Sequence, residues 1–191
     1  MKKLSLIIRK ITVPSVFAAA LLTILYLTCP EYFGNFWQFT CGLVFLVILP
    51  VLACPLQKYI PHYREKGREG QRSLAMLFSG IGYLLGTAAA FAADAPDALK
   101  TIYLEYLLCG LILTAFNKLF GLKASGHACG VVGPVLLFAY FKLYIPAVLG
   151  LILTVPVYIS SVKAKRHTVP QLIGGSVIPF AAFCIVYLIM R

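Results

Sequence analysis

The chain has 191 residues, of which 61% are hydrophobic and only 12% are charged, and its formal net charge is +11. A soluble domain of this length cannot bury so much apolar side chain, so the composition excludes a soluble globular protein and predicts an integral membrane protein. The basic residues are sparse and lie between apolar runs, which argues against nucleic-acid binding. We expect them to set membrane orientation, contact anionic lipid or bind phosphate.

Seven apolar runs are candidate membrane-spanning helices, each of which needs about 20 mostly apolar residues. In chain order they are residues 11–29, 36–54, 74–93, 101–120, 127–143, 146–162 and 170–190. The short connection near Tyr144 predicts a tight hairpin between the fifth and sixth runs. Because several runs are short, we expect an all-α polytopic bundle of six or seven transmembrane helices. It forms a single transmembrane domain, residues 1–191, to which residues 1–54 contribute the N-terminal helices.

The distribution of Lys and Arg predicts the orientation of this bundle. With the N-terminal cations Lys2, Lys3, Arg9 and Lys10 inside, the loops 55–73, 121–126 and 163–169 also fall inside, and this side collects 14 of the 17 Lys/Arg residues. The positive-inside rule therefore predicts a cytoplasmic N-terminus. A signal peptide would also explain the first run, but its small-residue cleavage pattern is poor, so we expect a retained helix.

The loops on this side end in residues that favour helix starts. Ser73, Ser125 and Thr168 precede the third, fifth and seventh runs, and Pro170 lies in the first turn of the last. Three helix N-termini on one face would present unpaired N–H groups and positive dipole ends, which suit phosphate. The cations expected around them are Lys66, Arg68, Arg72, Lys123, Lys163, Lys165 and Arg166.

Two motifs in this order resemble a known family. Ser125-Gly126-His127 follows a Lys/Arg-rich loop, and His167 precedes the last helix. Together they resemble the type-2 phosphatidic-acid phosphatase superfamily, which also includes bacterial acid phosphatases and vanadium haloperoxidases. That superfamily has Lys-x6-Arg-Pro, Pro-Ser-Gly-His and Ser-Arg-x5-His-x3-Asp motifs. The resemblance covers residues 60–190 and implies a phosphatidic-acid-phosphatase-like core in a bacterial inner membrane.

The resemblance also implies roles for individual residues. His167 would be the nucleophile that forms a phosphohistidine, His127 the general acid, and Gln171 the residue that orients His167. The implied phosphate-binding residues are Lys66, Arg72, Lys123, Ser125, Gly126 and Lys163. No metal or cofactor is expected. The implied partners are a lipid or isoprenoid phosphate substrate and membrane lipids, with no nucleic acid and no predicted oligomeric state.

The chain departs from the family pattern at several of these positions. Five residues rather than six separate Lys66 from Arg72, and the two motif prolines are replaced by Ser73 and Ala124. Ser161 stands at the arginine position, where Lys163 or Lys165 is a candidate substitute. Gln171 replaces the aspartate. An amide oxygen still accepts an imidazole N–H, but it does not stabilise an imidazolium as a carboxylate does.

Simpler interpretations of the same residues stay open. Thr168-Val169-Pro170-Gln171 fits a T-x-x-Q capping box, Ser125 fits a plain N-cap, and Gly174-Gly175 favours close helix packing. Glu105 lies inside the fourth run but near its end, where we expect the carboxylate to reach water. The sequence thus favours a membrane phosphatase acting on a lipid or isoprenoid phosphate. The alternative is a non-catalytic lipid-phosphate binding or carrier protein that retains the anion pocket.

Overall fold

The computed structural model describes residues 13–119 and 123–191. The four N-terminal cations used for the predicted orientation lie outside these described residues. Helices make up 86% of the described residues, which contain no strand, and this confirms the all-α prediction.

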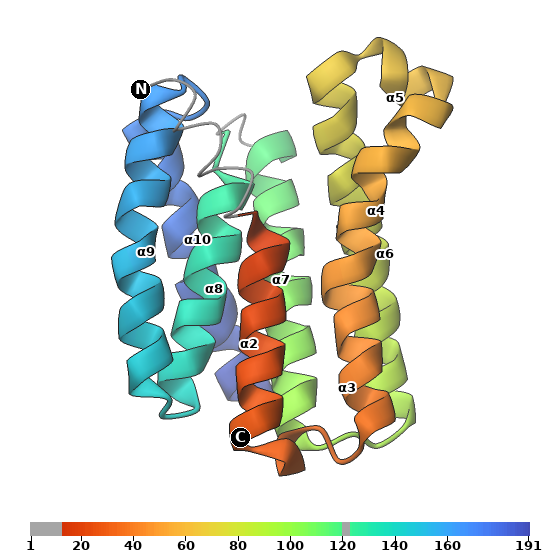
Figure 1. The fold of residues 1–191 in the computed structure, drawn as a ribbon, viewed down its shortest axis with the longest axis vertical. Helices are drawn as coiled ribbons and strands as arrows, with labels where there is room; N and C mark the ends of the chain where they lie inside the picture. The colour runs from red at the N-terminus through yellow and green to blue at the C-terminus, as the bar shows by residue number, and fades with distance from the viewer. Residues whose placement is uncertain (1–12, 120–122) are drawn as a thin grey trace. The chain divides into compact units, whose positions relative to one another are not determined.

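The helices follow one another with short connections (Figure 1). Their bounds are α2 (Pro14–Thr28), α3 (Phe36–Leu43), α4 (Leu49–Leu56), α5 (Pro61–Glu65), α6 (Gly67–Ala92), α7 (Asp97–Leu119), α8 (Gly126–Tyr140), α9 (Tyr144–Lys163) and α10 (Val169–Ile189). A π-helical turn, Val44–Ile48, joins α3 to α4, and short 3-10 turns cover Pro30–Tyr32 and Gln57–Tyr59.

Five helical segments among the described residues are long and apolar enough to cross a membrane. They are Phe36–Tyr59, Gly67–Ala92, Asp97–Lys118, Tyr144–Lys163 and Val169–Ile189. The other two predicted runs correspond to α2 and α8, which have 15 residues each and are shorter than a typical span.

The chain divides into two compact units. Unit 1 consists of Met1–Leu21 and Leu111–Arg191, and unit 2 consists of Leu22–Gly110. Helices α2 and α7 each contribute one part to each unit.

Unit 1 is built around α8, α9 and α10, which lie alongside one another (Figure 1). The predicted hairpin is present, because α8 ends at Tyr140 and α9 begins at Tyr144. The hydroxyls of Tyr158 in α9 and Ser176 in α10 are hydrogen-bonded, and Ser176 Oγ also donates to the Leu172 carbonyl at 2.7 Å. One hydrogen bond thus links α9 to α10.

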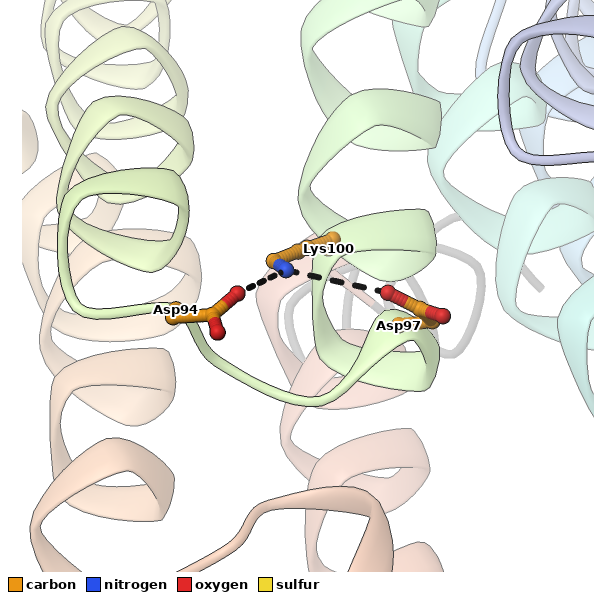
Figure 2. A network of polar contacts seen from close by, with 3 residues as sticks. All are labelled: Asp94, Asp97 and Lys100. Carbon is orange, nitrogen blue, oxygen red and sulfur yellow. Dashed lines mark hydrogen bonds and ion pairs between the residues drawn. The ribbon is translucent and has the colours of Figure 1, made fainter.

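Unit 2 is built on α6, which packs against α4 and the π-helical turn. Gly82 permits this packing, because a Cβ there would collide with the Phe45 carbonyl oxygen. At the α6–α7 turn, Lys100 Nζ lies 2.7 Å from Asp94 Oδ1 and 3.7 Å from Asp97 Oδ1 (Figure 2). The hydrogen bond and the positive charge of Lys100 lower the pKa of the Asp94 carboxyl below its ordinary value.

The prediction that Ser73 caps a helix was wrong. Helix α6 begins at Gly67, so Arg72 and Ser73 lie inside the helix and not at its start. The residues between them and Gly67 include Arg, Glu and Gln, which have high helix propensity, so the helix extends beyond the apolar run. One of the three predicted N-terminal anion sites, the one at Ser73, is therefore absent.

The expectation that the Glu105 carboxylate reaches water was also wrong. Glu105 is 1% exposed, and its Oε1 accepts a hydrogen bond from Cys109 Sγ at 3.3 Å. The two residues are one helical turn apart in α7, so the thiol reaches the carboxyl group directly.

Candidate functional site

The first turns of α8 and α10 are joined by a backbone hydrogen bond. The Ser125 N–H donates to the Gln171 carbonyl oxygen at 2.9 Å, although the two residues are far apart in sequence. Ser125 is fully buried, and its Oγ accepts from the Ala128 N–H at 3.2 Å. The predicted N-cap at Ser125 is therefore confirmed, and the Ser-Gly-His segment lies beside the start of the last helix.

Gly175 makes this close approach possible. A Cβ at Gly175 would collide with the Ser125 carbonyl oxygen and would lie 3.1 Å from the Ala128 Cβ. A Cβ at the neighbouring Gly174 would make only an ordinary 3.7 Å contact with the Ala124 Cβ. The expectation of close helix packing at this glycine pair is confirmed, and it depends on the second glycine.

The Gln171 side chain connects His167 to the first turn of α10. Gln171 Oε1 lies 3.2 Å from His167 Nδ1 and accepts from the Thr168 N–H at 3.3 Å. Because a backbone N–H donates to it, this atom is the amide oxygen, and it accepts from Nδ1 as well. Neutral His167 is thereby held with its proton on Nδ1, and Nε2 carries the lone pair.

The chain turns sharply between α9 and His167. The Lys165 N–H donates to the Val162 carbonyl at 2.9 Å, and the Arg166 N–H donates to the Ser161 carbonyl at 3.0 Å. This is the Schellman pattern of helix termination, and Lys165 adopts the left-handed conformation that it requires, with φ of +52°. The turn brings the residues after α9 back toward the start of α10.

An open depression of about 520 Å³ lies at this turn. Its lining consists of Val162, Lys165, Arg166, His167, Thr168, Val169 and Gln171. Among the described residues, Lys163 lies outside this lining and is exposed in the last turn of α9. Lys165 and Arg166 are the cations that line it. Both were among the cations expected around the phosphate, since they lie close to His167 in the sequence.

The remaining predicted residues of unit 1 lie at the start of α8. Gly126 is the first residue of the helix, His127 is the second, and the His127 Nε2 atom is buried. Lys123 is exposed in the segment that leads into the helix.

Lys66 and Arg72, which the sequence also predicted to bind phosphate, belong to unit 2. Lys66 precedes α6, and its Nζ lies 3.1 Å from His62 Nε2.

The two units carry very different charges. Unit 1 contains eleven Lys/Arg residues and no Asp or Glu, whereas unit 2 contains six Lys/Arg and six Asp/Glu residues. Among the described residues, no group of three or more His, Cys, Asp or Glu side chains could hold a metal ion. The depression is therefore a cationic surface with neutral hydrogen-bonding groups, which favours an anionic ligand.

No family model, curated protein or solved structure matches this chain.

Proposed function

We propose that the chain is a membrane phosphatase that hydrolyses a lipid or isoprenoid phosphate, as a monoester or diphosphate, through a phosphohistidine at His167. The observation that carries the proposal is the hydrogen-bonded chain His167–Gln171–Ser125, with distances of 3.2 Å and 2.9 Å. It joins the two segments that resemble the phosphatase motifs and fixes the His167 tautomer with a lone pair on Nε2.

In the first step, the Nε2 lone pair attacks phosphorus, and the bond from phosphorus to the leaving oxygen breaks, which is the alcohol oxygen of a monoester or the bridging oxygen of a diphosphate. His127, as an imidazolium, gives its proton to the departing oxygen. Water then attacks the phosphohistidine and loses a proton to His127, and the P–N bond breaks to release inorganic phosphate. Ser125, Gly126 and Lys123 are the proposed phosphate-binding groups of unit 1.

The apolar surface beside the depression favours a lipid over a soluble phosphate ester. Val169 belongs to the lining and is 55% exposed, and Ile173 and Val177, each 57% exposed, continue along the same side of α10. Residues four apart lie on one helix face, so these side chains form a stripe that leads away from the depression. An acyl or isoprenoid chain would lie along it with the phosphate at His167.

We place the protein in a bacterial inner membrane with this depression on the cytoplasmic face. Lys163, Lys165 and Arg166 cluster where α9 ends, and the positive-inside rule assigns such a cluster to the cytoplasm.

The alternative function is a lipid-phosphate binding or carrier protein without catalysis. Its specific support is Gln171, whose Oε1 already accepts the Thr168 N–H and so has a helix-capping role that needs no chemistry. Unit 1 also offers no carboxylate that would stabilise a charged His167.

Phosphate release by the purified full chain in detergent separates these functions. The substrates are phosphatidic acid, phosphatidylglycerol phosphate and an isoprenoid diphosphate, with a soluble phosphate ester for comparison. We expect metal-independent phosphate release from a lipid substrate. The rate of release should fall by at least about a thousandfold in His167→Ala. His62→Ala, which alters the histidine of unit 2, is the control and retains activity. Lipid-phosphate binding without release from any substrate supports the alternative.

A further inference from the structure

Three helices in the described residues end with a non-glycine residue in the left-handed conformation. They are Asp94, Lys142 and Lys165, with φ of +45°, +60° and +52°. Each terminates its helix in the Schellman pattern, where glycine is the usual residue because it has no Cβ to clash. Aspartate tolerates this conformation through local hydrogen bonds, whereas a lysine side chain offers no such compensation.

The two lysines have the same backbone role at opposite ends of α9 but different surroundings. Lys142 lies in the α8–α9 turn, where its N–H donates to the Ala139 carbonyl at 3.1 Å. Lys165 lies in the α9–α10 connection and lines the depression beside Arg166 and His167. No carboxylate of the described residues pairs with Lys165, and unit 1 has none in its sequence.

We propose that Lys165 is an anion-binding residue of this depression, and that its ammonium group contacts a phosphate monoester or diphosphate held beside His167. The proposal rests on the proposed function in that the same depression receives the phosphate, but it does not require hydrolysis. It gives Lys165 a role that Lys142 does not share, because Lys142 has the same left-handed backbone but lies outside the lining of the depression. At Lys165 glycine would supply the turn without the charge.

Thermal unfolding of the full chain in detergent tests this proposal, because one assay reports both backbone strain and ligand binding. The variants are Lys165→Gly, Lys165→Arg and the matched control Lys142→Gly. Each is measured alone, with inorganic phosphate, and with phosphatidic acid in mixed micelles. The two ligands distinguish a free phosphate from a lipid headgroup.

We expect both glycine variants to unfold at a higher temperature than the wild type without ligand, because each relieves the same strain. Only Lys165→Gly is expected to bind the phosphate ligands about tenfold more weakly, as loss of one charge-assisted hydrogen bond implies. Lys165→Arg should retain binding.

The proposal would be overturned if Lys165→Gly bound the ligands as tightly as the wild type, or if Lys142→Gly weakened binding equally. It would also be overturned if the wild-type chain bound neither ligand. Weaker binding in Lys165→Gly together with no phosphate release from any substrate would sustain Lys165 as a ligand residue while contradicting the phosphatase function. Release that continues unchanged in Lys165→Gly would contradict the Lys165 assignment alone.

Discussion

Units 1 and 2 differ most in how their charges are balanced. In unit 2, six cations accompany six carboxylates, and Lys100 is paired with Asp94 and Asp97 at the α6–α7 turn. Unit 1 carries the whole net charge of the chain, and its cations have no carboxylate of their own unit. Opposite charges that lie close together, as at the α6–α7 turn, attract each other locally, whereas an excess of one sign attracts ions of the opposite sign. This excess of positive charge supports our proposal that unit 1 is the unit that binds an anionic ligand.

The largest stability effect is expected where α10 meets the start of α8. In Gly175→Ala, the new Cβ would meet the Ser125 backbone, which cannot move aside as a flexible side chain does. We expect a loss of about 1–3 kcal/mol in unfolding free energy, as overpacking usually causes. Gly174→Ala is the control, since its Cβ has room and alanine favours a helix by up to about 1 kcal/mol.

Denaturant unfolding in detergent compares these two variants. Equal stability of Gly175→Ala and the wild type would mean that the α8 and α10 starts are not held together as described. The His167–Gln171–Ser125 chain would then lose its structural basis.

A second test adds a single carboxylate to unit 1. Gln171→Glu has the same shape, keeps an acceptor for His167 and the Thr168 N–H, and introduces a negative charge beside the imidazole. Because an opposite charge favours the charged ring, we expect about a tenfold rise in phosphate release. Gln171→Ala should reduce release, because it removes the acceptor that fixes the tautomer.

Steady-state kinetics on the same lipid substrate give this comparison. Nitrogen NMR of histidine-labelled protein adds a readout that does not depend on turnover, since the wild type should carry its proton on Nδ1 of His167. If Gln171→Glu and Gln171→Ala release phosphate at the same rate as the wild type, Gln171 acts only as a helix cap.

The smallest effect is expected in the stability of the α6–α7 turn of unit 2 at low pH. The pKa of Asp94 is lowered by Lys100, so the folded state binds the proton of this carboxyl less readily than the unfolded state. The pair therefore contributes its full stability above the unfolded carboxyl pKa of about 3.9, and that contribution is lost as the pH falls through the lower folded value.

Asp94→Asn should flatten this dependence while keeping a residue that tolerates the left-handed conformation. Hydrogen exchange at the α6–α7 turn, followed from neutral to acidic pH, measures the effect. Unit 1 lacks carboxylates and serves as the internal reference. If protection from exchange at this turn falls equally in Asp94→Asn and in the wild type on acidification, the ion pair does not stabilise the turn.

Much of the fold could be predicted because apolar runs and capping residues are local signals. The starts of α8 and α10 followed from Ser125 and from the T-x-x-Q pattern. The start of α6 was missed, because a polar sequence with high helix propensity lengthens that helix beyond its apolar run.

The lining of the candidate site was only partly predictable. Lys163, Lys165 and Arg166 were all expected around the phosphate, and of these three the turn after α9 places Lys165 and Arg166 in the lining. That turn has lysine where glycine normally marks the left-handed residue, so the usual signal was missing. The hydrogen bond between Ser125 and Gln171 is a long-range contact that no local pattern specifies.

Isolation of the phosphorylated protein tests the central claim, that His167 is a nucleophile, most directly. The full chain in detergent is mixed with phosphatidic acid carrying a radioactive phosphate, quenched in alkali, and digested to locate the label. We predict an acid-labile, alkali-stable phosphohistidine on the peptide that contains His167, absent from His167→Ala and present in His62→Ala. Lipid hydrolysis without this label, or a label on another residue, would contradict the account.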